Sequence, residues 1–177
     1  MMNNYLIINL IGKDQVGIAN LIIEFITNSE CNIIDSNINI FGEEFTATFF
    51  VYSNSINILK LENNLPLKAQ SLNLLSVTKV TKNHLDVANQ KYKYLIQAPD
   101  SIGIIKNIIS LFKNHKINIQ SLNTKLKDVN STNYLCIEII VRSNNMITLN
   151  ILKKELEIIC SKLSASLNTY VINDEET

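Results

Sequence analysis

Apolar positions in the first half of the chain switch between two periodicities. The apolar run 5–10 predicts a buried strand, and apolar residues then recur every three or four positions after Gly17, as on one face of a helix. Residues 34–41 alternate between apolar and polar, which predicts a strand with one face in the core. Residues 45–51 alternate again after a Gly42-Glu43 turn, so the two segments predict a hairpin. The helical stripe comprises Ile18, Leu21, Ile22, Phe25 and Ile26.

A second helix and a closing strand complete this half, and the second half repeats the same order. We expect the helix over 55–65 to end near Pro66, because proline lacks a backbone N–H. The strand 72–80 follows it. In the second half the pattern predicts strands at 92–97, 118–126, 135–141 and 167–172, and helices over 104–112 and 149–163.

Identical residues at a constant separation confirm that the two halves are repeats. The pairs separated by 86 positions are Asp14 and Asp100, Gly17 and Gly103, and Asn32 and Asn118. Each copy has the order β-α-β-β-α-β, so we predict an α+β chain of two tandem ferredoxin-like domains, each an antiparallel sheet with two helices on one face. The expected domains are 1–81 and 92–177, joined by a polar linker at 82–91, with a short acidic tail on the second.

The charge balance narrows the classes of function. Sixteen basic and sixteen acidic side chains cancel, which argues against a protein that grips nucleic acid through phosphates. No apolar run approaches the roughly 20 residues that cross a bilayer, and no basic segment precedes the first strand, so we expect neither a membrane span nor a signal peptide. Three widely spaced cysteines suggest no disulfide framework, and we expect a cytoplasmic protein.

Residues for catalysis are scarce. We expect both histidines, His84 in the linker and His115 after a helix, to be solvated, because local structure holds no carboxylate or nucleophile beside either. Phosphate-loop and metal-ligand spacings are missing from the sequence. We therefore predict that the chain is not an enzyme and holds no cofactor or metal.

The repeated corner between first strand and first helix is the best candidate for a binding site. Amides at a helix N-terminus attract a carboxylate, the aspartate can accept from an ammonium group, and the asparagine offers both donor and acceptor. We expect the glycine to let a ligand or backbone approach closely. From the residue types alone a purely local role is favoured, in which the aspartate caps the helix, the glycine allows tight packing and the asparagine shapes a turn. The candidate residues are Asp14, Gln15, Val16, Gly17, Ile18, Asn32 and Ile33, and Asp100, Ser101, Ile102, Gly103, Ile104, Asn118 and Ile119.

The pattern Gly12-x-Asp14-x-x-Gly17-Ile18, followed by Asn32-Ile33, resembles the ACT domain family. That resemblance implies small regulatory modules that bind amino acids at this corner, between paired domains. The second copy matches less well, because it has Ala98 where the first has Gly12. The two corners are therefore not expected to be equivalent.

Longer segments are similar to the family of glycine cleavage system transcriptional repressors: residues 32–36, 42–46 and 65–68. This resemblance implies a cytoplasmic repressor that senses a small amino acid, glycine, and acts by contacting a LysR-type activator without reading DNA itself. We also expect a homodimer, because the helix-free sheet faces and the edge strands need cover. The alternatives are an ACT-type regulatory subunit of an amino-acid biosynthetic enzyme and an interaction module that binds no ligand.

Overall fold

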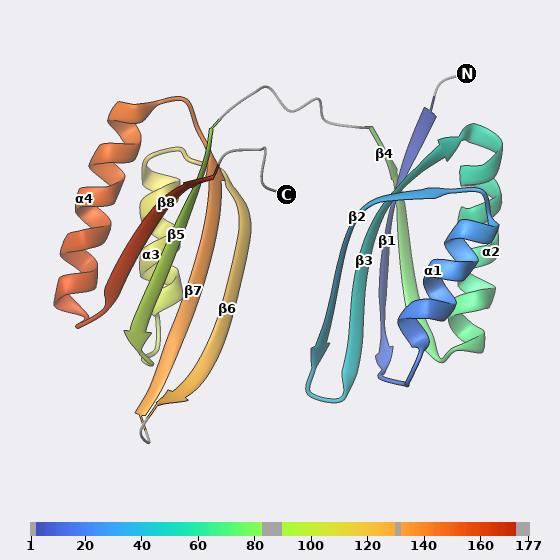
Figure 1. The fold of residues 1–177 in the computed structure, drawn as a ribbon, viewed down its shortest axis with the longest axis horizontal. Helices are drawn as coiled ribbons and strands as arrows, with labels where there is room; N and C mark the ends of the chain where they lie inside the picture. The colour runs from blue at the N-terminus through green and yellow to red at the C-terminus, as the bar shows by residue number, and fades with distance from the viewer. Residues whose placement is uncertain (1–2, 83–89, 130–131, 173–177) are drawn as a thin grey trace. The chain divides into compact units, whose positions relative to one another are not determined.

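The chain folds into two compact units, Met1–Leu85 and Asp86–Thr177. The computed structural model describes residues 3–82, 90–129 and 132–172 (Figure 1). Most of the predicted linker, with His84, and the whole predicted acidic tail lie outside these residues. No helix in the described ranges is both long enough and apolar enough to span a membrane.

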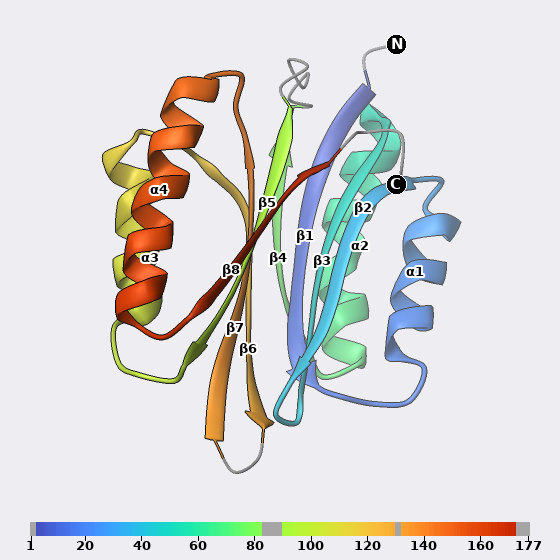
Figure 2. The ribbon, with the colours of Figure 1, turned by 60° about the vertical axis from the view of Figure 1, so that its left-hand side comes forward.

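The first unit is a four-stranded antiparallel sheet with the strand order β2-β3-β1-β4. Both helices cover one face of this sheet, as Figure 1 and Figure 2 show. The elements are β1 (Asn3–Lys13), α1 (Ile18–Asn28), β2 (Asn32–Phe41), β3 (Glu44–Asn54), α2 (Ser55–Ser71) and β4 (Leu74–Thr81).

The second unit repeats this topology, with the strand order β6-β7-β5-β8. Its elements are β5 (Lys91–Pro99), α3 (Ile104–Asn114), β6 (Ile119–Val129), β7 (Thr132–Arg142), α4 (Met146–Lys162) and β8 (Ser166–Ile172). The predicted fold class, two tandem ferredoxin-like domains, is therefore confirmed.

Each unit has its own hydrophobic core between the sheet and its helices. Alternate residues of β1 and β3 supply the sheet side of the first core: Leu6, Ile8, Leu10, Phe45, Ala47, Phe49 and Val51. Helix α1 contributes Ile18, Ile22 and Ile26. Leu21, which the predicted stripe included, is exposed instead, because the buried face of α1 is narrower than the apolar pattern.

The prediction that β2 has one face in the core is wrong. Ile34, Ile38 and Ile40 are all exposed, and of the residues in β2 only Ile33 packs against the core. The helices bury their apolar residues against the central strands β1 and β3, whereas β2 lies at the edge of the sheet. The alternation in sequence therefore predicted the strand correctly, but it did not show that the helices leave this strand uncovered.

The predicted end of the second helix is also wrong, because α2 continues through Pro66 to Ser71. Leu61, Leu65 and Ala69 lie one turn apart and are all buried, so the apolar stripe runs past the proline. Burying a leucine contributes about 2 kcal/mol, and an interior proline costs about 3 kcal/mol. The packing of residues on both sides of Pro66 therefore offsets the lost backbone hydrogen bond.

Candidate functional site

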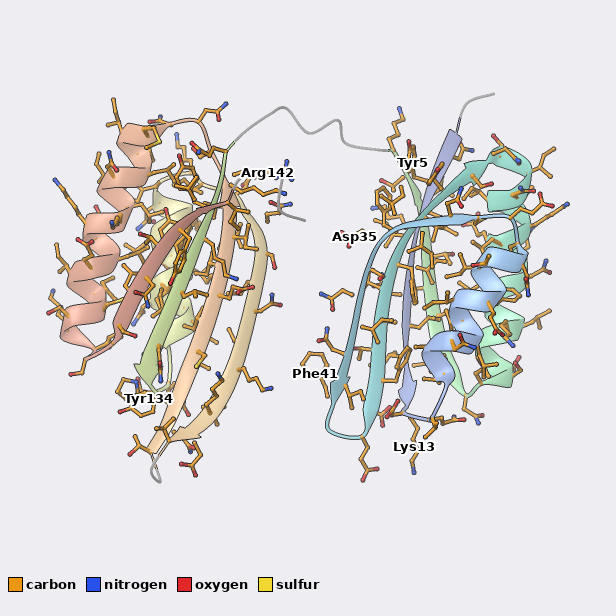
Figure 3. All side chains as sticks on the ribbon, in the orientation of Figure 1. Tyr5, Lys13, Asp35, Phe41, Tyr134 and Arg142 are labelled. Carbon is orange, nitrogen blue, oxygen red and sulfur yellow. The ribbon has the colours of Figure 1, made fainter. Side chains whose placement is uncertain are left out.

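Three contacts hold the first corner in place between the β2–β3 hairpin and the end of α2. The Asp14 amide donates to the Glu43 carbonyl at 2.9 Å. The Gln15 side chain donates to the Leu72 carbonyl at 3.4 Å, and the Ile18 amide donates to the Gln15 carbonyl at 3.1 Å. Figure 3 shows Lys13, the last residue of β1, at this end of the unit together with Phe41. Hydrogen bonds to two neighbouring segments and within the turn therefore fix the conformation of this corner.

Gly17 is the N-cap residue of α1, with a left-handed backbone (φ 84°) and no capping side chain. The expectation that Asp14 caps the helix is therefore wrong, because no side chain caps α1; the backbone amide of Asp14 binds the hairpin. No backbone of the described residues approaches either glycine closely, because a Cβ on Gly17 or Gly103 would meet nothing within 4 Å; the approach of a ligand stays a prediction. Both glycines are needed for their positive φ, which is 91° at Gly103.

The close approach occurs at Gly12, five residues earlier. A Cβ there would lie 2.5 Å from the Asn73 carbonyl oxygen and 2.9 Å from the Leu74 Cδ2 atom. Gly12 pairs with Leu74 at the end of the β1–β4 ladder. The missing side chain therefore lets the α2–β4 turn close against the base of the corner.

The second corner keeps the contact to its hairpin but lacks the close approach of the neighbouring turn that occurs at Gly12. The Asp100 amide donates to the Asn133 carbonyl at 2.9 Å, the equivalent of the contact to the first hairpin. Ala98 is the counterpart of Gly12 and is fully buried. The β5–β8 ladder ends one residue earlier, at Gln97 and Ser166, so the methyl group has room. The structure thus gives the two corners different surroundings.

The other candidate residues of the two corners occupy matching positions. Val16 and Ile102 are fully exposed, whereas Ile18 and Ile104 are buried and anchor the first turn of each helix. Ser101 accepts from the Ile104 amide at 3.5 Å through its carbonyl. The apolar side chains before each glycine are therefore presented to the surroundings of each unit.

Asn32 and Asn118 do not join the corners within their own units. Asn32 begins β2 opposite Tyr52, which in turn pairs with Tyr5, whereas Lys13 at the corner pairs with Glu44. The eleven residues of α1 separate Asn32 from the corner, a length of about 16 Å. Asn118 directly precedes β6, at the same place in the second unit. The expectation that each asparagine and aspartate share one corner is therefore wrong for a single unit.

Ile33 and Ile119 follow these asparagines and pack against the cores. They hold the start of each edge strand against its unit.

A polar cluster missed by sequence reasoning fixes the turn before Asn32. Glu30 has a left-handed backbone (φ 57°). Its carbonyl accepts from the Ser53 hydroxyl at 2.7 Å, and its carboxylate accepts from the Asn57 side chain at 3.1 Å. Asn57 is buried and lies one turn before Leu61 on the stripe of α2. A polar residue on that stripe is the signal that could have identified it.

The prediction that His115 is solvated is wrong, and a carboxylate 40 positions away in sequence lies beside it. Its side chain is 19% exposed, and its Nε2 atom lies 3.0 Å from Oε2 of Glu155 on α4. This contact joins the two helices of the second unit. Among the described residues, no group of three histidine, cysteine, aspartate or glutamate side chains could hold a metal ion.

Comparisons with known proteins agree with this architecture. Residues 4–79 match the ACT domain family. The chain is 28% identical over 173 residues to the glycine cleavage system transcriptional repressor of Escherichia coli (strain K12), covering 96% of this chain and 91% of the relative. The Shigella flexneri protein of the same name gives the same values.

Solved structures extend the likeness to both units. A crystal structure of a protein proposed to be a glycine cleavage system transcriptional repressor has a TM-score of 0.71 at 27% identity, covering 98% of this chain and all of that one. An unknown protein from Galdieria sulphuraria has a TM-score of 0.76 over 97% of this chain and all of that one, but is 17% identical and bears on the fold alone. Similarity to named repressors over almost the whole chain supports a regulatory role. The first unit therefore matches the ACT domain family over residues 4–79, the second unit repeats its topology, and the chain as a whole resembles the glycine cleavage system transcriptional repressor.

Proposed function

We propose that this protein is a cytoplasmic, glycine-sensing transcriptional regulator that acts through a protein partner and does not read DNA. The observation that carries the proposal is the 28% identity to named repressors over 96% of the chain. The balance of sixteen basic and sixteen acidic side chains supports it, because direct DNA readers usually carry an excess of positive charge. The chain has no catalytic role in this proposal.

The proposed ligand is a small zwitterion at the corners. The amides at the start of α1 or α3 suit its carboxylate, and the exposed carboxylate of Asp14 or Asp100 suits its ammonium group. Asp14 and Asn32 lie at opposite ends of the first unit. One ligand can therefore contact both residues only when two copies of the chain pair, so a homodimer is part of the proposal.

Matched substitutions test which corner holds the ligand. Asp14→Ala and Asp100→Ala remove the same group from equivalent positions, and glycine binding to each folded variant is measured by calorimetry. We expect one of them to weaken binding at least about tenfold, as expected for a lost charge-assisted hydrogen bond. Unchanged binding in both variants would show that the ligand lies elsewhere.

The proposed protein partner is a LysR-type activator. The chain is immobilised and incubated with the activator, with and without glycine, and its binding to the regulated promoter is measured in parallel. We expect glycine-dependent capture of the activator and no sequence-specific binding of DNA by the chain alone. Specific DNA binding without the activator would contradict the mechanism. Recovery of a biosynthetic enzyme's catalytic subunit from cells would favour the regulatory-subunit alternative.

A further inference from the structure

The sheet of the second unit has one strongly basic face. Alternate residues of β5 and β7 are buried against the helices, so the residues between them point to the helix-free face. Strand register places the neighbouring residues of β6 and β8 on the same face, because opposed residues of paired strands share a side. We define the basic face by its charged residues, which are Lys91, Lys93, Lys125, Lys127, Glu138 and Arg142.

One carboxylate faces the five cations of the basic face. The Nζ atom of Lys93 lies 2.5 Å from Oε2 of Glu138, and the Asn123 side chain donates to the same carboxylate at 3.5 Å. Lys125 and Lys127 are exposed, and within the described part of the chain neither ammonium group forms an ion pair or a hydrogen bond. The two lysines of β6 are therefore available to a partner.

The first unit shows that the fold does not require these cations. Strand register gives each of the five basic positions a counterpart on the helix-free face of the first sheet. None of the counterparts is charged: they are Tyr5, Ile7, Asn39, Phe41 and Tyr52. The same topology thus forms without positive charge at these positions. The charge of the basic face therefore indicates recognition of something negatively charged.

Apolar side chains lie between the cations and indicate that the partner is a protein. Arg142 and Tyr134, which is opposed by a lysine of β6, lie near opposite ends of β7 (Figure 3). Between these ends, Leu95 and Ile140 point to the same face, together with Tyr170, which is 51% exposed. An apolar centre with a polar, charged rim is the usual composition of a protein–protein interface.

A nucleic acid fits the basic face less well. The Glu138 carboxylate lies among the cations and repels phosphates. Sheet faces that bind single-stranded RNA stack bases on aromatic rings of their strands. The middle of the two central strands presents Leu95 and Ile140 on this face instead. The chemistry of the face therefore favours the carboxylates of a protein over phosphates.

We propose that the basic face of the second unit binds an acidic surface of the protein partner. Lys125 and Lys127 meet carboxylates at one end of the interface, Lys91 and Arg142 meet them at the other, and the apolar side chains pack between. The inference rests on the proposed function, which supplies the partner. It deepens that function by naming the surface that meets the LysR-type activator and the sign of the charge on the activator.

Reversal of the two β6 charges tests the proposal. Lys125→Glu combined with Lys127→Glu changes the basic face, and Lys113→Glu combined with Lys154→Glu makes the same change of net charge at exposed positions on α3 and α4. Biolayer interferometry measures the dissociation constant for the activator, with and without glycine, and circular dichroism checks folding. We expect at least about tenfold weaker binding for the β6 pair and less than about a twofold change for the helix pair.

Further variants separate charge from packing. Lys125→Arg combined with Lys127→Arg keeps both charges and should keep the affinity. Tyr170→Ala removes the aromatic ring from the apolar centre and should weaken binding at least about fivefold. Binding of the wild type should also weaken as the salt concentration rises, because salt screens exposed charges.

The outcomes keep this proposal apart from the proposed function. A folded β6 glutamate pair that binds the activator as tightly as the wild type would overturn the basic face as the docking surface and leave the activator as the partner. Equal losses in the β6 and helix glutamate pairs, or a loss in the arginine pair as large as in the glutamate pair, would also overturn it. A wild type that binds no activator contradicts the partner itself, and this proposal with it. Promoter DNA that binds the wild type alone and is released by the β6 glutamate pair would assign the face to nucleic acid.

Discussion

Gly12 provides a quantitative test of how the first corner is built. We predict that Gly12→Ala lowers the free energy of unfolding of the first unit by about 2 kcal/mol. The new Cβ would lie 2.5 Å from the Asn73 carbonyl oxygen and 3.2 Å from the Leu74 Cα atom. Both are backbone atoms, so the α2–β4 turn must move. Overpacking costs about 1–3 kcal/mol, and a contact of 2.5 Å with a backbone atom belongs at the upper end of that range. The smaller entropy of the unfolded alanine variant returns about 0.4–1 kcal/mol, which leaves about 2 kcal/mol.

The opposite change in the second repeat is the matched control. Ala98 has a fully buried methyl group at the equivalent position, so Ala98→Gly should cost about 1 kcal/mol through lost burial and a more flexible backbone. Hydrogen exchange in increasing urea, read by mass spectrometry, follows peptides of each unit separately. The reasoning is refuted if Gly12→Ala remains within about 0.5 kcal/mol of the wild type, a change typical of an unconstrained surface site.

Three smaller predictions concern charge, thiols and backbone strain. The Nζ atom of Lys93 lies 2.5 Å from Oε2 of Glu138 and lowers the pKa of that carboxyl. Glu138→Gln should therefore lower the free energy of unfolding by about 0.5 kcal/mol at pH 7, as measured in urea melts. This difference should disappear as the pH falls through the lowered pKa, because the wild-type carboxylate then protonates. Burial raises the pKa of the Cys31 and Cys160 thiols. A colorimetric thiol reagent should therefore label both cysteines slowly in the native protein and rapidly in urea. Fast labelling of the native protein at these two cysteines would contradict their burial. Exposed Lys116 has a left-handed backbone (φ 56°) after α3. Lys116→Gly should relieve this strain, which raises the free energy of unfolding by about 0.5 kcal/mol and with it the thermal midpoint. A lower midpoint would contradict the prediction.

Element types and topology followed from the sequence because each depends on a local period. The alternation in 45–51 predicted β3, and its alternate residues are buried. The 86-residue repeat then assigned the same topology to the weaker second half. A period does not say what covers a face, however. The isoleucines of β2 alternate as well as the residues of β3, yet β2 is an uncovered edge strand.

The candidate corners were only partly predictable, for reasons of chain direction and distance in sequence. Asp14 and Asn32 lie at opposite ends of the unit because α1 carries the chain from one end of the sheet back to the other. The contact of His115, at the C-terminal end of α3, with Glu155 on α4 joins residues 40 positions apart, which no local pattern reveals. Similarly, the close approach at Gly12 depends on where β4 begins.

Calorimetric titration of the folded, full-length chain with glycine tests the central claim most directly. We predict saturable binding of glycine, with a weaker response to larger amino acids. Structural integrity is checked on the same sample by circular dichroism. The contradicting result is a folded protein that gives no binding heat with glycine up to about 10 mM, well above a millimolar dissociation constant. Such a protein would also show no glycine-induced rise in its thermal midpoint.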